Sequence, residues 1–287
     1  MTVRPRVVLV DGVPMSALVA EATEPRAVVV ALHGGGSTAA YFDCPGHPSL
    51  SLLRIGAALG FTVIALDRPG YGSSAPYPEA LAEPEQRVRL AYGAVDRILG
   101  ERPTGLFVVA HSNGCELALR MAADARGADL LGIEMAGTGR RYHPAAREVL
   151  KTASATHRPP GLRELLWHPP ELYPPEVLGG LTNSATGAPY EAAMVTEWPR
   201  RDFPALAAQV RVPVQFSVAE HEKVWQSDAA ALAEIAAMFS ASPRFTVNEQ
   251  PGAGHNLSLG HAAAAYHRKI FAFVDECLAT QADLEAG

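Results

Sequence analysis

The stretch Ala110-His111-Ser112-Asn113-Gly114 decides the fold, because it places one serine between two small residues directly after an apolar run. The run, residues 106–109, is typical of a buried strand in a parallel sheet, and residues 115–123 have the pattern of a helix. The chain has only a few residues in which to turn from the strand into the helix. A turn that sharp crowds the backbone around the serine, so the positions two residues away from it must be small. Ala110 and Gly114 meet that requirement. We therefore predict that Ser112 stands on a strand–turn–helix elbow, with its hydroxyl exposed above the sheet.

A serine hydroxyl is a weak nucleophile at neutral pH and needs a histidine base together with a carboxylate that orients the base. His255 follows the glycine-rich residues 250–254, between a strand-like segment and a helical one. An earlier strand pattern, residues 212–218, ends in Ala219-Glu220-His221-Glu222. The residues therefore offer His255 as the base and either Glu220 or Glu222 as the acid.

Residues 31–37, Ala-Leu-His-Gly-Gly-Gly-Ser, end an early strand in consecutive glycines. Such a loop can turn a backbone N–H toward a developing oxyanion, and the N–H of the residue after the serine can do the same. We expect an oxyanion hole made by Asn113 and by Gly35 or Gly36. A serine in this context could also be an ordinary helix N-cap. A histidine, an acid and a glycine loop also lie at predicted strand ends, which favours a nucleophilic role for Ser112.

These motifs resemble those of the α/β-hydrolase superfamily, and the resemblance covers nearly the whole chain. Residues 66–74, Leu-Asp-Arg-Pro-Gly-Tyr-Gly-Ser-Ser, are similar to that family's turn after the fourth strand. His33-Gly34-Gly35-Gly36 resembles its oxyanion loop, and Gly252-Ala253-Gly254-His255 resembles its histidine loop. There are two departures: Ala110 stands where glycine is commoner, and Glu222 stands where most members have aspartate.

The resemblance implies a triad of Ser112, His255 and Glu222, because the family's acid lies three residues after a small residue, here Ala219. It also implies an α/β fold: a mostly parallel central sheet with helices on both faces. The implied reaction is hydrolysis of an ester, lactone or thioester through an acyl-serine intermediate. The alternatives are an acyltransferase, a lyase or a carbon–carbon bond hydrolase that uses the same triad, or a non-catalytic small-molecule-binding protein. Serine rather than aspartate at the elbow argues against dehalogenation and epoxide opening.

The alternation of strand and helix patterns breaks between residues 137 and 206, where prolines separate short helical pieces. A structureless loop of that length inside a compact domain is improbable. We therefore expect a helical lid at residues 137–206, inserted into a core of residues 1–136 and 207–287. Candidate pocket residues for a small apolar or aromatic acyl group are Trp167, Tyr190, Met194 and Trp198. The same residues could instead fasten the lid to the core.

Composition limits the partners. The chain has 287 residues and a net charge of −6, and it lacks a basic cluster, which argues against nucleic acid and anionic membranes. Three cysteines without metal-like spacing, and an N-terminal apolar run too short for a signal peptide, predict a reduced cytoplasmic protein. We expect a small-molecule substrate, no cofactor and no metal. The sequence leaves the oligomeric state open.

Short apolar runs and helical periods give the expected layout. Strands are expected at 6–10 and 15–20 (a hairpin), 28–32, 62–66, 106–109, 130–136, 212–218 and 244–249. Helices are expected at 50–59, 83–99, 115–123, 228–239 and 258–278.

Overall fold

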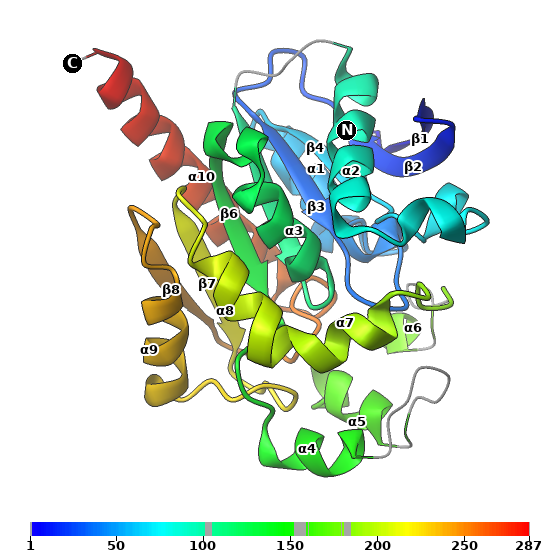
Figure 1. Cartoon of the computed structure of the whole chain (residues 1–287), viewed down its shortest axis with the longest axis vertical. Coiled ribbons are helices and arrows are strands. Elements are labelled where there is room, and N and C mark those ends of the chain that lie inside the picture. Colours follow the sequence, from blue (N-terminus) through cyan, green and yellow to red (C-terminus); the bar gives the residue numbers. More distant parts are fainter. Residues whose placement is uncertain are drawn as a thin grey trace.

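The computed structural model describes residues 2–100, 105–151, 159, 161–178, 180 and 185–286. These residues form one eight-stranded sheet in the order β1-β2-β4-β3-β5-β6-β7-β8 (Figure 1). β2 is antiparallel to both of its neighbours, and the other strand pairs are parallel. The predicted mostly parallel sheet is thus confirmed. The strands are β1 (Arg4–Val10), β2 (Val13–Ala20), β3 (Val28–Leu32), β4 (Thr62–Leu66), β5 (Leu106–His111), β6 (Leu130–Ala136), β7 (Val214–Ala219) and β8 (Phe245–Gln250).

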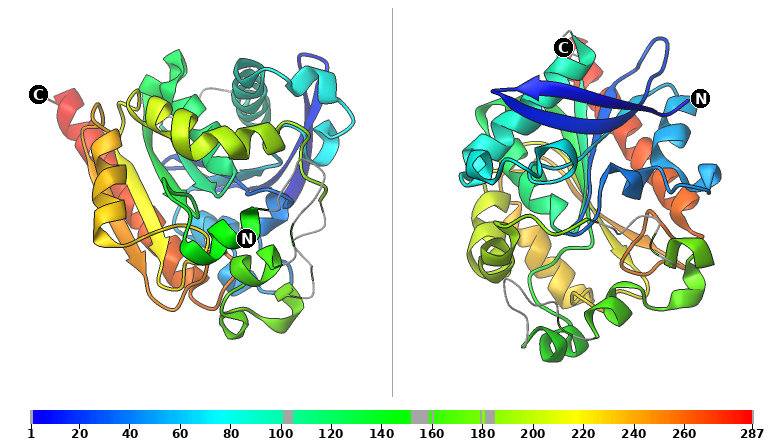
Figure 2. Two further views of the ribbon diagram at one scale, coloured as in Figure 1. Left: turned by 60° about the horizontal axis from the view of Figure 1, so that its bottom comes forward. Right: turned by 90° about the vertical axis from the view of Figure 1, so that its right-hand side faces the viewer.

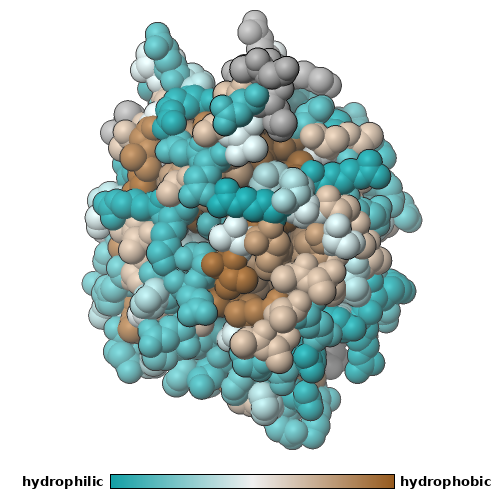
Figure 3. Space-filling model, turned by 90° about the vertical axis from the view of Figure 1, so that its left-hand side faces the viewer, coloured by the Kyte–Doolittle hydropathy of each residue, from teal (hydrophilic) through white to brown (hydrophobic). Residues whose placement is uncertain are grey.

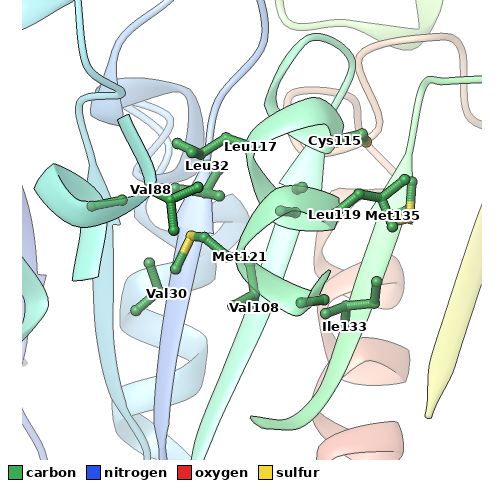
Figure 4. Close-up of a cluster of buried hydrophobic side chains, with 14 of the residues drawn as sticks. Val30, Leu32, Val88, Val108, Cys115, Leu117, Leu119, Met121, Ile133 and Met135 are labelled. Carbon is green, nitrogen blue, oxygen red and sulfur yellow. The ribbon is translucent and has the colours of Figure 1, made fainter. Parts of the chain in front are cut away.

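Helices cover both faces of the sheet (Figures 1 and 2). One face packs against α2 (Pro84–Leu99), α3 (Gly114–Ala123) and α9 (Ala229–Met238), and the other packs against α1 (Leu52–Ala58) and α10 (Ala263–Ala286). Figure 4 shows the first of these layers, where side chains of α3 meet those of β3, β5 and β6. Because both faces are covered, every residue of β3, β4 and β6 is buried, as expected for parallel strands.

Two boundaries differ from the expectation for identifiable reasons. β7 begins at Val214 rather than at residue 212, since Pro213 has no N–H to give to a neighbouring strand. The last helix begins at Ala263 rather than at residue 258. Residues 256–262 form turns instead, and the N–H of His261 donates to the carbonyl of Leu172, 2.8 Å away. The chain after His255 is therefore held against residues of the segment between β6 and β7.

That segment, residues 137–206, is called the insertion segment below. It emerges at the carboxyl end of β6 and lies beside the strand ends (Figure 1). Its contacts with the core include a hydrogen bond of 2.7 Å from Tyr190 Oη to the carbonyl of Pro69 and packing of α8 on α3. Its described α-helices are α4 (Pro144–Leu150), α5 (Leu162–Leu166), α6 (Pro175–Leu178), α7 (Glu191–Glu197) and α8 (Phe203–Ala207), with a π-helical turn, Trp198–Asp202, between the last two.

The edge strands carry most of the large aliphatic side chains that the described part of the chain exposes. Val7 and Leu9 of β1 are about three-fifths exposed, and Val247 lies on β8 at the opposite edge. The right-hand view of Figure 2 brings the β1–β2 hairpin to the front. Figure 3 faces the side of β8 and α9, where hydrophilic residues surround an apolar patch. Apolar surface at these edges is separate from the two buried layers that hold the sheet.

The elbow between β5 and α3 has the predicted form. Ser112 has a φ of 52°, in the left-handed region that a non-glycine residue rarely occupies, and its N–H donates to the carbonyl of Ala136 at 2.8 Å. Gly114 lies against β3, and a Cβ at this position would overlap the backbone carbonyl oxygens of Leu32 and His33. The Cβ of Ala110 is accommodated within the buried strand. The elbow therefore requires glycine at its second small position but not at its first.

We predict that Gly114→Ala destabilises the fold by about 3 kcal/mol or more, because a backbone carbonyl cannot move aside as a flexible side chain can. Urea denaturation of the variant and the wild type measures the change. Ala110→Gly is the matched control and should cost only about 1 kcal/mol. Equal losses at the two positions would contradict this account of the elbow.

A buried carboxylate lies in the middle of the sheet. Glu134 of β6 accepts hydrogen bonds of 2.8 Å from Tyr266 of α10 and from Gln215 of β7, and no arginine or lysine among the described residues pairs with it. Burial raises the pKa of Glu134 to about 7, although the hydrogen bonds from Ser217, Tyr266 and Gln215 lower it in part. The folded protein therefore favours the protonated carboxyl.

This burial predicts a pH dependence of stability. The contribution of protonated Glu134 is fully present below the ordinary carboxyl pKa of 4.5 and is lost as the pH rises through about 7. Glu134→Gln, which stays neutral, should gain up to about 3 kcal/mol relative to the wild type between these limits. Urea denaturation across that pH range measures the difference. The exposed Glu249→Gln serves as control, and parallel curves for Glu134→Gln and the wild type would contradict the prediction.

Candidate active site

Ser112 lies at the carboxyl end of β5 and borders a small cavity beneath the insertion segment. The cavity measures about 20 Å³, which is room for about one water molecule. Its walls combine polar groups close to Ser112 with aromatic and aliphatic groups from the insertion segment. The lining residues are Ser112, Asn113, Glu116, Thr138, Tyr142, Met194, Val195, Trp198 and Trp225.

His255 and Glu222 form a buried pair. Nδ1 of His255 lies 2.9 Å from Oε2 and 3.1 Å from Oε1 of Glu222, so that this nitrogen carries the proton and donates it to the carboxylate. Oε1 also accepts the N–H of Val224 at 2.7 Å. Burial alone would raise the pKa of Glu222, but the His255 ring and the backbone N–H groups of Val224 and Trp225 together hold it below its usual value. The acid is therefore ionised and fixed in place.

The other ring nitrogen of His255 is available to receive a proton. Nε2 is buried and has no hydrogen-bond partner among the described residues. Two glycines locate this ring relative to Ser112: a Cβ on Gly137 would lie 3.2 Å from His255 Cε1, and a Cβ on Gly34 would lie 3.0 Å from Ser112 Cβ. Both positions also abut the ring of His111. The ring of His111, the residue before Ser112, thus lies next to the ring of His255, with centroids 5.1 Å apart.

His111 supports the backbone of the histidine loop. Its Nε2 lies 2.9 Å from the carbonyl oxygen of His255, and its ring stacks on Tyr41 with centroids 4.6 Å apart. Burial, and then the neighbouring His255, lower the pKa of His111 well below its usual value. A neutral His111 ring that donates from Nε2 fits both the lowered pKa and the short distance to the His255 carbonyl oxygen. His111 is therefore a packing residue of the site.

Glu220, the alternative acid, lies away from His255. Its side chain is 55 % exposed, and its Oε2 accepts the N–H of Gly252 at 2.8 Å. It therefore closes the histidine loop from outside, whereas the Glu222 side chain is only 5 % exposed and bonds the histidine ring directly.

The glycine loop after β3 approaches the elbow closely. The N–H of Gly36 donates to Tyr71 Oη at 3.0 Å, whereas no described residue accepts a hydrogen bond from the N–H of Gly35 or of Asn113. Gly35 packs so tightly that a Cβ would lie 2.6 Å from Nδ2 of Asn113. His33 holds the loop, since its Nδ1 donates to the Gly34 carbonyl at 2.8 Å and its Nε2 accepts the N–H of Arg68 at 3.1 Å. Two unused backbone donors thus lie beside Ser112.

The candidate pocket residues divide into two groups. Met194 and Trp198 line the cavity with Ser112. Trp167 packs against Tyr173 in the layer of α1 and α10. Tyr190 donates to the carbonyl of Pro69 at 2.7 Å, and its ring lies 4.1 Å from the Arg87 guanidinium. The last two residues therefore attach the insertion segment to the core, which was the alternative that the sequence left open.

Other residues of the cavity wall carried weaker signals in the sequence. Glu116 lies one helical turn after Ser112 on α3, where an i,i+4 spacing could have identified it. It is buried between Arg87, 3.2 Å away, and Arg120. Thr138 and Tyr142 follow β6, and Trp225 lies just after Glu222. Their convergence depends on tertiary contacts such as the stacking of Tyr142 on Trp225, with centroids 4.4 Å apart.

The described ranges hold no group of three or more His, Cys, Asp or Glu side chains arranged to bind a metal ion. Among the helices that the structure describes, none is both long enough and apolar enough to cross a membrane.

Known proteins with this architecture are numerous. A bacterial membrane phospholipase A superposes with a TM-score of 0.69 at 16 % identity, over 96 % of this chain and 86 % of that one. An N-acyl homoserine lactonase complexed with N-hexanoyl homoserine lactone superposes with a TM-score of 0.68 at 17 % identity, over 96 % and 98 %. An epoxide hydrolase from Vigna radiata gives 0.65 at 18 % identity, over 96 % and 98 %. At such identities the similarity shows the fold alone.

A comparison with curated proteins found no significant match. A family model, however, matches residues 29–268, which include β3, the elbow and the histidine loop. This match covers more than half of the chain, and it agrees with the eight-stranded sheet, so the chain belongs to the alpha/beta hydrolase family.

Proposed function

We propose that this hydrolase uses Ser112 to cleave a carboxylic ester, lactone or thioester with a small apolar or aromatic acyl group. The observation that carries the proposal is the buried His255–Glu222 pair. The Nε2 of His255 has no partner among the described residues, and its ring lies beside His111, the chain neighbour of the left-handed Ser112. An ordinary N-cap serine would need neither the strained φ nor the paired histidine.

In the first half of the reaction, His255 Nε2 takes the proton from Ser112 Oγ as that oxygen attacks the substrate carbonyl carbon. The C–O or C–S bond to the leaving group then breaks, and His255 returns the proton to the departing oxygen or sulfur. Water attacks the acyl-Ser112 in the second half, again giving its proton to His255. The carboxylic acid is released, and the Ser112 hydroxyl is restored. Each half therefore moves one proton onto Nε2 and off again.

Glu222 stabilises the imidazolium that forms in each half of the reaction. Its carboxylate is ionised, and its hydrogen bond to Nδ1 fixes the tautomer that leaves Nε2 as the acceptor. The extra methylene of glutamate relative to aspartate is accommodated because the Val224 and Trp225 N–H groups hold Oε1.

The oxyanion is received by the N–H groups of Gly35 and Asn113. Gly36, the alternative donor, is the weaker candidate because its N–H already donates to Tyr71 Oη. Donors that are fixed in advance cost no reorganisation as charge develops, and one such donor typically lowers the barrier by ~2.7–4 kcal/mol.

The insertion segment serves as a lid over this site, with Met194, Val195 and Trp198 facing Ser112 across the cavity. Serine at the elbow argues against epoxide opening, although an epoxide hydrolase shares the fold.

We predict that Ser112→Ala abolishes labelling by a fluorophosphonate and lowers ester hydrolysis by at least about 10⁴-fold. Intact-mass spectrometry of the labelled wild type should show one adduct on Ser112. A labelled Ser112→Ala variant, or unchanged turnover, would contradict the proposal. A reaction in ¹⁸O-labelled water distinguishes hydrolysis from acyl transfer, because hydrolysis places ¹⁸O in the released acid whereas transfer puts none into the acyl product.

The acid is tested by a matched pair. Glu222→Gln should lower kcat by on the order of 10³- to 10⁴-fold, because a neutral amide neither fixes the tautomer nor stabilises the imidazolium. Glu220→Gln, two residues earlier at a position more than half exposed, should leave kcat within about twofold. Steady-state kinetics on p-nitrophenyl butyrate provides the measurement. The reverse ranking would identify Glu220 as the acid.

We predict that Met194→Ala extends the accepted acyl chain, since truncation enlarges the cavity beside Ser112. The ratio of kcat/KM for p-nitrophenyl octanoate to that for the acetate should rise about tenfold or more. Trp167→Phe, a change outside the cavity, is the control. An unchanged ratio in Met194→Ala would place the acyl chain elsewhere.

A further inference from the structure

A buried ion pair joins the insertion segment to the turn after β4. Glu191, the first residue of α7, places Oε1 2.5 Å from Nη2 of Arg68. Its other oxygen, Oε2, accepts the hydroxyl of Tyr71 at 2.6 Å. All three side chains are buried, and Arg68 is completely so. Glu191, Arg68 and Tyr71 are called the Glu191 cluster below.

The Glu191 cluster makes direct contact with the glycine loop. Tyr71 Oη accepts the N–H of Gly36 at 3.0 Å and that of Ala188 at 3.3 Å. With its proton donated to Glu191, this hydroxyl uses its donor and both acceptor positions. One oxygen atom therefore ties the insertion segment, on either side of Tyr190, to the loop that follows β3.

Two further contacts fix the same loop. The N–H of Arg68 donates to Nε2 of His33, and Nδ1 of His33 donates to the Gly34 carbonyl. A Cβ on Gly35 would lie only 3.3 Å from Oε2 of Glu191, so the loop packs against the carboxylate with no space between. The peptides on both sides of Gly35 are thus held by residues of the cluster or by their direct partners.

The charges of the cluster balance each other. Burial alone would lower the pKa of Arg68, but the Glu191 carboxylate outweighs it and raises the pKa, so the guanidinium stays charged. Nε and Nη1 of Arg68 have no hydrogen-bond partner among the described residues. Glu191 is therefore the main compensation for a cation that the fold buries directly behind the glycine loop.

We propose that Glu191 is a positioning residue for the oxyanion hole: acting through Tyr71, it holds residues 33–36 so that the Gly35 N–H points at the developing oxyanion. This role rests on the proposed function of Ser112. Because Glu191 belongs to the insertion segment, the oxyanion hole is completed only when α7 is packed on the core. The segment then contributes to the chemical step as well as to the cover of the cavity.

Tyr71→Phe is the sharpest test, because it removes the link to Gly36 while the Arg68–Glu191 ion pair remains. On p-nitrophenyl butyrate we expect kcat to fall about 10- to 100-fold with KM within about threefold. A trifluoromethyl ketone, which forms a hemiketal oxyanion on Ser112, should lose affinity by a similar factor. Glu191→Gln keeps the shape and removes the charge, and it should change kcat and inhibitor affinity in the same direction.

Tyr92→Phe is the matched control, since Tyr92 is also buried and its hydroxyl donates to the Met121 carbonyl, at 2.8 Å, within the helical layer. Active-site titration with the fluorophosphonate normalises each kcat to folded enzyme, so a loss of folded protein is not counted as a loss of rate. We expect Tyr92→Phe to lower stability while kcat per titrated site stays at the wild-type value.

The outcomes separate the two proposals. Wild-type kcat and inhibitor affinity in titrated Tyr71→Phe would overturn the positioning role and leave the role of Ser112 intact. A rise in KM with unchanged kcat would also overturn it, because that result describes substrate binding rather than oxyanion stabilisation. Failure of the fluorophosphonate to label Ser112 in the wild type would overturn the proposed function itself and the positioning role with it.

Discussion

The close approach of α3 to the end of β3 is the constraint on which the site depends. Gly114 lies against the carbonyl oxygens of Leu32 and His33, where any side chain would overlap them. This contact forces the tight elbow and holds Ser112 in the left-handed region. It also brings the N–H of Asn113 beside the glycine loop. The proposed nucleophile and the proposed oxyanion donors therefore depend on one backbone-to-backbone contact that only glycine permits.

Buried charge is concentrated at this same end of the sheet, and there it is paired. Glu222 bonds His255, Glu191 bonds Arg68, and Glu116 lies between Arg87 and Arg120. Each pairing offsets the cost of removing a charge from water. Glu134 contrasts with these residues, because it has only neutral partners and is accordingly shifted toward its protonated form. Paired charges thus lie near the serine, while the carboxyl in the middle of the sheet has a pKa raised to about 7 by burial.

The sequence predicted those parts of the fold and site whose cause is local. Ala110 and Gly114 revealed the elbow through residue size, and the covered strands were evident from their continuous apolar runs. The contacts that depend on distant parts of the chain were not predictable. Nothing near Glu191 in sequence indicates Arg68, 123 positions away, and the late start of α10 follows from a bond between His261 and Leu172. The division of the pocket candidates has the same cause. Trp167 and Met194 are both large apolar residues of the insertion segment, and only tertiary contacts decide that Trp167 packs on the core while Met194 lines the cavity.

One face of α7 connects these features. Glu191, Met194, Val195 and Trp198 follow the i, i+3, i+4, i+7 spacing, so they form a single stripe along the helix and its π-helical continuation. The first residue of the stripe bonds Arg68 and Tyr71 behind the glycine loop, and the other three line the cavity beside Ser112. A helix moves as a rigid unit, so a displacement that enlarges the cavity also draws Glu191 away from the loop. In the proposed mechanism, the fit of the acyl group and the position of the oxyanion donors are therefore coupled through this one helix.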